Sequence, residues 1–240
     1  KYFRMRKDVP LIVPEVNAHH LTNHKNIISN PNCSTIQLVL ALKDIHAKYR
    51  VKRIVVSTYQ AVSGAGKAAM DELIFQTKNI LRGKKIKSKN FTKQIAFNLI
   101  PHIDAFGLDG YTKEELKMEF ETKKILGNKI NLSSTCVRVP VITSHSESIN
   151  VEFAKKYNLK KIIELLKKTK GCKVINKHKN GSYITPLEAE GDYKTYISRI
   201  RRDRTNLKAI NLWVVSDNLL KGAALNSVQI AETIVKKRLN

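Results

Sequence analysis

Residues 55–66 read VVSTYQAVSGAG and contain the clearest structural signal in this sequence. A β-branched run, typical of a strand, leads into a Ser-Gly-Ala-Gly turn, and the residues that follow have helical spacing. Glycines at such a turn let backbone N–H groups come close to a phosphate or a cofactor ring. Because many strands pass into helices through similar turns, the stretch predicts an α/β fold but is only weak evidence for a ligand-binding site.

The periodicity of the rest of the chain predicts a mixed α/β sheet with helices on one face. A capping box is expected where Thr112 is followed three residues later by Glu115. Helices are expected over residues 34–48, 66–81, 112–126, 158–169 and 219–237. Strands are expected over residues 11–16, 53–58, 95–100, 129–142, 148–153, 173–176 and 210–215, with an exposed loop over 177–194.

The composition is that of a folded but strongly basic protein. The 240 residues are 42% hydrophobic, which excludes a disordered tail, and carry 44 Lys+Arg against 20 Asp+Glu for a formal net charge of +24. The longest nearly apolar stretch, residues 36–42, is too short to span a bilayer. The cations are mostly scattered lysines without a helix-turn-helix, RNP or KH signature, so we expect a solvated surface. Binding to polyanions at low salt remains the alternative.

Two features bear on cellular context. Cys33, Cys136 and Cys172 are an odd number of widely separated cysteines without C-x-x-C spacing, so a reducing compartment such as the cytoplasm is expected rather than a disulfide framework or a zinc site. The chain opens KYFRMRK, without an initiator Met or the apolar segment of a secretion signal. We therefore expect the sequence to be a fragment that lacks an N-terminal part.

Four short motifs contain residues suited to chemistry. In SNPNCST, Cys33 precedes an apolar helix whose N–H groups and dipole favour a thiolate and an oxyanion, although a buried structural cysteine is equally compatible with the motif. In TCVRVPV, Arg138 on a strand suits bidentate capture of a carboxylate, and His145 in SHSES suits acid/base work. In ETKK, Glu121 and Lys124 share one helix face, as an exposed ion pair would.

Together with RIRRD and LWVVSDNLLKGAA, these motifs stand in the same order as in aspartate-semialdehyde dehydrogenases, and residues 3–232 resemble that family throughout. The resemblance implies an α/β (α+β) fold, with a mixed-sheet catalytic and dimerisation domain of the glyceraldehyde-3-phosphate-dehydrogenase-like type and remnants of a Rossmann nucleotide-binding domain. It implies NADPH-dependent reductive dephosphorylation of L-aspartyl-4-phosphate to L-aspartate-4-semialdehyde and phosphate. The product would feed the synthesis of lysine, threonine, methionine and diaminopimelate.

The resemblance also assigns roles to individual residues. Cys33 matches the nucleophile that forms a thioester, and His145 matches the acid/base. The matching substrate-binding residues are Arg138 for the α-carboxylate, Glu121 for the ammonium, Lys124 and Arg4 for the phosphate, and Asn32 and Gln60. Ser63, Gly64 and Asn218 match contacts to NADP(H), and no metal is expected. The implied partners are the substrate, its products and further copies of the chain in a homodimer or homotetramer, without a membrane or a specific nucleic acid.

The sequence departs from the family pattern at two points. Ser144 precedes His145 where many relatives have Gly, and no G-x-G-x-x-G follows a strand. We therefore divide the chain into the end of the NADP-binding domain (1–31), the catalytic and dimerisation domain (32–208), and a strand and helix that return to the NADP-binding domain (209–240). By itself the chain is expected to be inactive.

Two other assignments were weighed against this one. The chain could be a catalytically silent dimerisation module. It could also be a related acyl-phosphate reductase such as N-acetyl-glutamyl-phosphate reductase, which would have no need of Glu121 because its substrate amine is acetylated.

Overall fold

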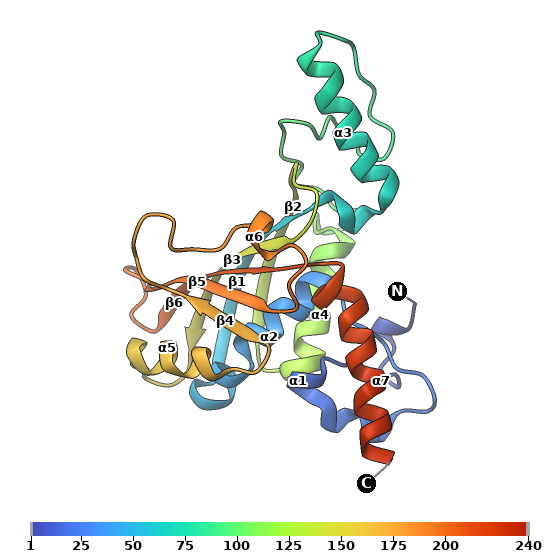
Figure 1. Cartoon of the computed structure of the whole chain (residues 1–240). Helices are drawn as coiled ribbons and strands as arrows, with labels where there is room; N and C mark the ends of the chain where they lie inside the picture. The colour runs from blue at the N-terminus through green and yellow to red at the C-terminus, as the bar shows by residue number, and fades with distance from the viewer. Residues whose placement is uncertain (1, 239–240) are drawn as a thin grey trace.

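The computed structural model of the chain describes residues 2–238, which fold around a six-stranded mixed sheet (Figure 1). The spatial order of the strands is β2-β1-β3-β6-β5-β4, with β1 parallel to β2, β4 parallel to β5 and the other neighbours antiparallel. The strands are β1 (Val51–Gln60), β2 (Asn131–Arg138), β3 (His145–Phe153), β4 (Cys172–Ile175), β5 (Thr195–Arg202) and β6 (Ala209–Ser216). The mixed sheet expected from the sequence is confirmed.

Helices cover one face of this sheet and extend beyond it. The covering helices are α2 (Cys33–Tyr49), α4 (Lys113–Leu126) and α5 (Leu159–Lys168). The other helices are α1 (Pro14–Asn17), α3 (Lys67–Leu81), α6 (Pro186–Ala189) and α7 (Leu225–Arg238), joined by short 3₁₀ turns η1 (Tyr2–Met5), η2 (Ala18–Asn23) and η3 (Val62–Ala65) and the π-helical turn η4 (Leu220–Ala224). None of the helices within residues 2–238 is both long and apolar enough to cross a membrane.

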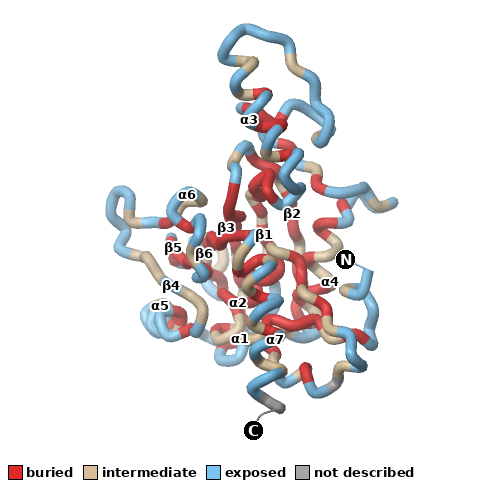
Figure 2. Tube along the Cα trace, turned by 45° about the vertical axis from the view of Figure 1, so that its right-hand side comes forward, coloured by how far each residue is buried: buried red, intermediate tan, exposed pale blue. Residues whose placement is uncertain are grey.

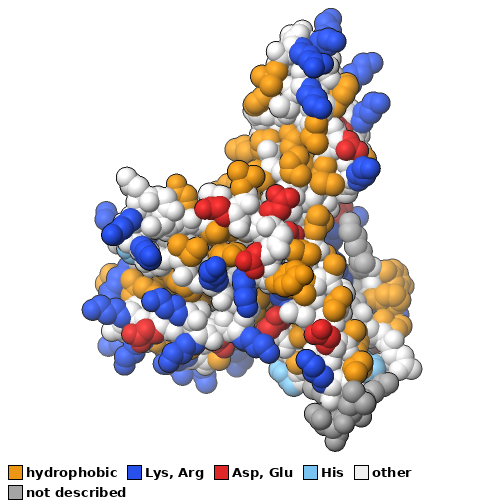
Figure 3. All heavy atoms as spheres, in the orientation of Figure 1, with side chains coloured by type: hydrophobic (Ala, Val, Ile, Leu, Met, Phe, Trp, Pro, Cys, Tyr) orange, Lys and Arg blue, Asp and Glu red, His pale blue; other side chains and the backbone are white. Residues whose placement is uncertain are grey.

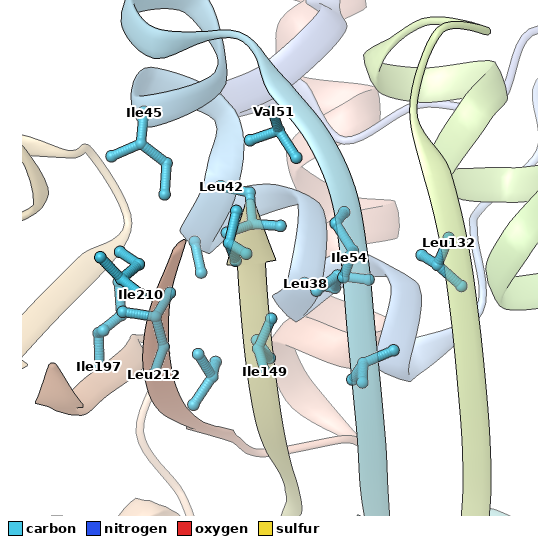
Figure 4. Packing of buried hydrophobic residues seen from close by; sticks show 14 of the residues in the cluster. Leu38, Leu42, Ile45, Val51, Ile54, Leu132, Ile149, Ile197, Ile210 and Leu212 are labelled. Carbon is cyan, nitrogen blue, oxygen red and sulfur yellow. The ribbon is translucent and has the colours of Figure 1, made fainter. Parts of the chain in front are cut away.

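The main core lies between α2 and the sheet (Figure 4). Leu38, Leu42 and Ile45 project from α2 toward Ile54 of β1 and Ile149 of β3, and all five side chains are fully or almost fully buried. Burying each such side chain contributes about 1.5–3 kcal/mol relative to leaving it in water. This packing fixes the start of α2 over the carboxyl end of β1.

The opposite face of the sheet carries half-buried side chains. Along β1 the buried residues Ile54 and Val56 alternate with half-buried Ser57 and Tyr59, as the period of a strand requires. Tyr59 packs against Trp213 of β6, with 5.6 Å between the ring centroids. This face therefore presents aromatic and small polar side chains that are only partly shielded from solvent.

Residues 67–111, which we call the arm, project away from the sheet at the top of Figure 1. The arm is largely exposed in Figure 2, but Leu73 and Ile95 belong to a small hydrophobic cluster of its own. Its seven Lys and Arg residues between 78 and 93 are all exposed, and Figure 3 shows many of them at the tip. Inside the arm, the buried Glu72 carboxylate accepts from the backbone N–H groups of Lys89 and Asn90.

Two expected strands are wrong, for a local reason in each case. Residues 11–16 make only one bridge, between Leu11 and Ser29, because Pro14 starts the short helix α1. Residues 95–100, within the arm, make only one bridge, between Ile100 and Arg138, because the N–H groups of Ile95 and Ala96 both donate to the Gln76 side chain instead of to a strand. The sequence analysis also does not predict β5, whose outer half is rich in arginine.

The two ends of the chain pack against each other. Ile230 of α7 is buried against Ile12 and Leu21. A second contact is an ion pair: the Lys221 ammonium lies 2.7 Å from a carboxylate oxygen of Glu15, and the lysine is almost fully buried. This pair joins the π-helical turn η4 to the segment before α2, so both ends of the chain support the region around Cys33. The division into three domains stays a prediction.

Candidate active site

The candidate site lies where β1 and β2 end and β3 begins. Gln60 and Arg138 are register partners at the carboxyl ends of the parallel strands β1 and β2. His145 is the first residue of the antiparallel strand β3, so it starts at the same edge. Gln60, Arg138 and His145 are all buried although they are polar. Buried polar groups at one edge of a sheet point to a functional site.

Cys33 is the first residue of α2, one residue earlier than the helix start expected from the sequence. The side-chain oxygen of Asn32 accepts from the N–H groups of Ser34 at 2.9 Å and Thr35 at 3.2 Å, which is a helix N-cap. A Cβ added to Gly222 would lie 2.9 Å from the Cβ of Cys33. Position 222 therefore has to be Gly for η4 to pack directly against the thiol.

A cavity of about 450 Å³ opens at this point and brings together most of the residues predicted from the sequence. The predicted residues in its wall are Arg4, Asn32, Cys33, Gln60, Ser63, Gly64, Arg138 and Asn218. Cations, amides and one thiol thus face the same space. No group of three or more His, Cys, Asp or Glu side chains among the described residues is arranged to hold a metal ion.

Three predicted site residues lie outside the wall of this cavity. His145 is buried behind Gly64, where an added Cβ would lie 3.2 Å from the His145 ring and from Arg138. Glu121 is fully buried, and its carboxylate accepts from the N–H of Asn32 at 2.6 Å. Lys124 is bonded through its ammonium to three backbone carbonyls, at Arg4, Arg6 and Val9.

The residues predicted to contact the cofactor form a hydrogen-bonded group at the rim. The Asn218 amide donates to the Ser63 hydroxyl at 3.0 Å, and its oxygen accepts from the N–H of Ser144 at 2.9 Å. Ser144 adopts a φ of 72°, in the left-handed region. Such a conformation carries a steric cost for Ser that Gly would not have.

Burial, not the helix dipole, dominates the ionisation of the candidate nucleophile. Burial raises the pKa of Cys33 to about 12, and the Glu114 carboxylate adds to the increase. The N–H of Ser34 and the nearby Arg138 and Arg4 act in the opposite direction. The helix start thus lowers the pKa of Cys33, as the motif indicates, but burial outweighs that effect.

The histidine is neutral for a related reason. Burial and the adjacent Arg138 charge hold the pKa of His145 well below its ordinary value. Its Nδ1 accepts from the N–H of Ala61 at 3.0 Å, so the proton of the neutral ring is on Nε2. Nε2 is buried and has no hydrogen-bond partner within residues 2–238. An unpartnered N–H is the group that a reacting oxygen or sulfur would engage.

The cavity also contains three charged residues that the sequence analysis does not select, Asp104, Glu114 and Lys117. The Lys117 ammonium lies 2.6 Å from Asp104 and 3.4 Å from Glu114. Glu114 and Lys117 stand seven residues before Glu121 and Lys124 respectively. Since seven residues are close to two helical turns, the two pairs share one face of α4, and this repeated spacing was a signal that could have found them.

Known proteins match both the fold and this site-bearing region. The family profile described as "Semialdehyde dehydrogenase, dimerisation domain" matches residues 42–221. An aspartate-semialdehyde dehydrogenase of Aquifex aeolicus is 52% identical over 99% of this chain and 71% of its own length. The crystal structure of aspartate semialdehyde dehydrogenase II from Vibrio cholerae, complexed with ASA, has a TM-score of 0.95 and 45% identity over 98% of this chain and 70% of that one. The Candida albicans enzyme crystallised with NADP has a TM-score of 0.76 and 27% identity over 100% of this chain and 70% of that one.

The sheet with its cysteine-bearing helix and the match to the dimerisation domain define a semialdehyde dehydrogenase, an oxidoreductase. Within that class, the relatives identify the substrate branch. The chain belongs to the aspartate-semialdehyde dehydrogenase family, as its sequence predicts, and it spans about 71% of the length of the curated relatives that it matches.

Proposed function

We propose that Cys33 attacks the acyl carbon of L-aspartyl-4-phosphate in the reductive dephosphorylation that yields L-aspartate-4-semialdehyde and phosphate. The observation that supports this proposal most directly is that Cys33, Arg138 and Gln60 line one cavity. A substrate with a carboxylate, an ammonium and a phosphate needs side chains of both signs. A simple hydrolase would not need that combination.

The charged residues divide between the ends of the substrate. One guanidinium N–H of Arg138 donates to the Ala61 carbonyl at 2.6 Å, which orients the group so that its remaining N–H groups can bind the α-carboxylate. We assign the ammonium to Glu114, the carboxylate that lines the cavity, rather than to Glu121, which is fully buried outside its wall. We assign the phosphate to Arg4 and Lys117, which both line the cavity, whereas the Lys124 ammonium is bonded to three backbone carbonyls outside it.

The covalent step begins with the thiol of Cys33. Its sulfur forms a bond to the acyl carbon, and the carbon–oxygen bond to phosphate breaks, with the electron pair leaving on the phosphate and the thiol proton passing to that phosphate. A thioester on Cys33 remains, and hydride addition at its carbonyl carbon gives a thiohemiacetal. When this species collapses, the carbon–sulfur bond breaks and releases the aldehyde. His145 would hold and move a proton at Nε2, toward the oxygen or sulfur that develops negative charge.

NADPH would supply the hydride, and Ser63, Gly64 and Asn218 at the cavity rim would contact its nicotinamide end. Those residues fit a flat polar ring, because they present a backbone turn opposite an amide. The pyrophosphate needs a Gly-rich strand-to-helix turn; the full G-x-G-x-x-G pattern does not occur in the 240 residues, and the stretch GAGKAA at residues 64–69 has Ala in the last position. The product of the reaction would enter lysine, threonine, methionine and diaminopimelate synthesis in the cytoplasm.

This division predicts that the 240-residue chain, by itself, neither binds NADPH tightly nor turns over substrate. Fluorescence titration of NADPH measures the first property directly. A dissociation constant in the low micromolar range would contradict the assignment of the cofactor residues. The same solution, examined by light scattering, tests whether the chain forms a homodimer or homotetramer, for which we propose the half-buried face around Tyr59 and Trp213.

The nucleophile is tested by comparing the three thiols. In iodoacetamide labelling followed by peptide mapping, Cys33 should react before Cys136 and Cys172, because it alone lines the cavity and Cys136 is fully buried. L-aspartate-4-semialdehyde should protect Cys33. In Arg138→Lys this protection should weaken by roughly 10-fold or more, because Lys cannot reproduce a bidentate contact. Preferential labelling of another cysteine would overturn the proposal.

A further inference from the structure

Lys221 places an ammonium group in the interior of the protein, directly before the glycine that packs on Cys33. Only 1% of its side chain is exposed to solvent, although lysine is among the residues that are least often buried. No step of the proposed reaction uses it, and it does not line the cavity. Its burial therefore requires another explanation.

Three side chains use the full hydrogen-bonding capacity of this ammonium, which has three N–H donors. Its Nζ lies 2.7 and 2.9 Å from the two carboxylate oxygens of Glu15 in α1. It also donates to Asn226 at 3.0 Å and to Gln229 at 2.7 Å, both in α7. One side chain of η4 thus connects this turn to α1 and α7.

Such a buried ion pair contributes more to geometry than to stability. Taking two charges out of water is costly, so apolar side chains of the same volume are often as stable or more stable in their place. Directional bonds to three partners, in contrast, fix the ammonium at one point. The position of Lys221 therefore has a consequence for the backbone on either side of it.

The backbone of η4 passes that consequence to Cys33. The N–H groups of Gly222 and Ala224 bond five residues back, to the carbonyls of Asp217 and Leu219, as in a π-helix. Such turns are rare and frequently occur at functional sites. Gly222 faces Cys33 so closely that an added Cβ would lie 2.9 Å from the cysteine Cβ. A shift of η4 would open this contact.

A second path of hydrogen bonds leads from Lys221 to the cavity wall. The Asn226 side chain, which accepts from the ammonium, donates to the Asn30 side-chain oxygen at 2.6 Å. Asn30 in turn donates to the Ala223 carbonyl at 3.3 Å. Asn30, Gly222 and Ala223 all line the cavity. The ammonium therefore supports one wall of the site from behind, outside the space that the substrate would fill.

We propose that Lys221 is a positioning residue, whose ammonium, held by Glu15 and by two side-chain amides of α7, keeps η4 packed against Cys33. This anchor determines how closely the thiol is enclosed. The inference rests on the proposed function only in taking Cys33 as the reacting thiol.

The test compares Lys221→Met with Lys43→Met in the 240-residue chain. Met has nearly the length of Lys but carries no charge and no donor. Lys43 is a matched control, because it lies in α2 and its ammonium also bonds to Glu15, but at the backbone carbonyl, at 2.7 Å. The measurements are the rate of iodoacetamide labelling of each cysteine over a range of pH, the protection of Cys33 by L-aspartate-4-semialdehyde, and urea unfolding.

In Lys221→Met, Cys33 should be labelled roughly 10-fold faster at neutral pH, because water reaches the sulfur and only the thiolate reacts. Burial is the largest cause of the raised pKa of Cys33, so the labelling profile should also move to lower pH. Protection by the semialdehyde should weaken, since one wall of the cavity has moved. Lys43→Met should leave all three properties of Cys33 unchanged.

Cys136 reports whether any change is local, because it is fully buried in the main core. Its labelling should be the same in Lys221→Met as in the unmodified chain. Faster labelling of Cys33 and Cys136 together would show a general loosening of the fold. Unchanged labelling of Cys33 in Lys221→Met would show that η4 keeps its place without the anchor. Either result would overturn the inference.

Glu15→Gln gives a second arm, which also serves if Lys221→Met does not fold. It keeps the size of the side chain and one acceptor oxygen but removes the charge. Labelling of Cys33 should be faster than in the unmodified chain but slower than in Lys221→Met, because the ammonium retains its partners in α7. In the double variant the rate should equal that of Lys221→Met alone, since the two side chains act as a pair.

No acceleration in Glu15→Gln, or fully additive effects in the double variant, would contradict the pairing and overturn the inference. If L-aspartate-4-semialdehyde does not protect Cys33 of the unmodified chain, the proposed function fails instead. The labelling rates still test the role of Lys221 in that case, so the two failures are distinguished.

Discussion

The sheet body and the arm solve the same problem of burial in different ways. The body is held by a continuous hydrophobic cluster in which Phe153 and Leu42 are fully buried. The arm buries few apolar residues and instead folds its loop around polar side chains, with Glu72 and Gln76 bonded to backbone N–H groups of residues 89–96. The comparison teaches that the stability of a projecting segment with a small core depends on specific hydrogen bonds. The stability of the body depends instead on the packing of buried hydrophobic side chains.

The largest expected effect comes from truncating one aromatic residue in each region. Phe153→Ala should lower the free energy of unfolding by about 3–5 kcal/mol, the usual cost of removing a buried ring. Phe75→Ala in the arm should cost less than about 1 kcal/mol, since 57% of that side chain is already exposed. Urea unfolding of both variants measures the difference. Equal losses would mean that the arm and the body share one core.

A second contrast lies in two buried carboxylates. Glu72 in the arm accepts four hydrogen bonds, whereas Glu121 in the body accepts from the N–H of Asn32 and has Arg4 at 3.9 Å. Burial raises the pKa of Glu121 to about 7 from an ordinary value of 4.5. The unfolded chain therefore releases this proton at lower pH than the folded chain, and folding loses stability as the pH rises from 4.5 to 7.

The loss from this one group should be up to roughly 3 kcal/mol. Glu121→Gln cannot titrate, so its unfolding free energy should vary less with pH over that interval than that of the unmodified chain. Urea unfolding at a series of pH values measures both slopes. Identical slopes would show that Glu121 ionises normally in the folded protein.

The smallest expected effect is local to the arm. Glu72→Gln replaces two or more of the acceptor positions by an NH₂ group, which should destabilise the loop by about 1–3 kcal/mol. Hydrogen exchange should then become faster at the N–H groups of Lys89 and Asn90 by roughly 10-fold or more, with the β1 amides unchanged. Faster exchange throughout β1 would mean that the arm does not open separately from the body.

The same contrast explains which parts of the fold could be predicted from sequence. Body helices such as α2 and α4 were predicted within about two residues, because burial against one sheet imposes the helical period and Thr112 caps α4 as its motif indicates. Residues 95–100 do not form the expected strand although their apolar side chains pack, because the N–H groups of Ile95 and Ala96 bond to Gln76 and only Ile100 bridges to β2. No periodicity reveals that a side chain has replaced a neighbouring strand.

Site residues that lie within the family motifs could be predicted from the sequence. Charged residues that reach the site through contacts between distant elements could not. Cys33, Gln60 and Arg138 lie together in the cavity as the motifs indicate. Glu114 was missed because its contacts reach Asn32 and Gln60, both more than 50 positions away in the chain. The protonated thiol was also missed, since burial is a property of the assembled fold and a helix start is a property of the local sequence.

The strand order has a consequence for how the molecule reaches its native state. Residues 61–130 separate the parallel partners β1 and β2, and residues 154–208 separate β3 from β6, so among the described strands that pair with each other only β5 and β6 are joined by a short connection. Contacts between residues so far apart in the sequence form slowly, because the long loop between them must first be closed at a cost in entropy. During synthesis, β1, β2 and β3 are complete before β6 emerges. Gln60, Arg138 and His145 can therefore meet early, whereas the turn that packs on Cys33 arrives last.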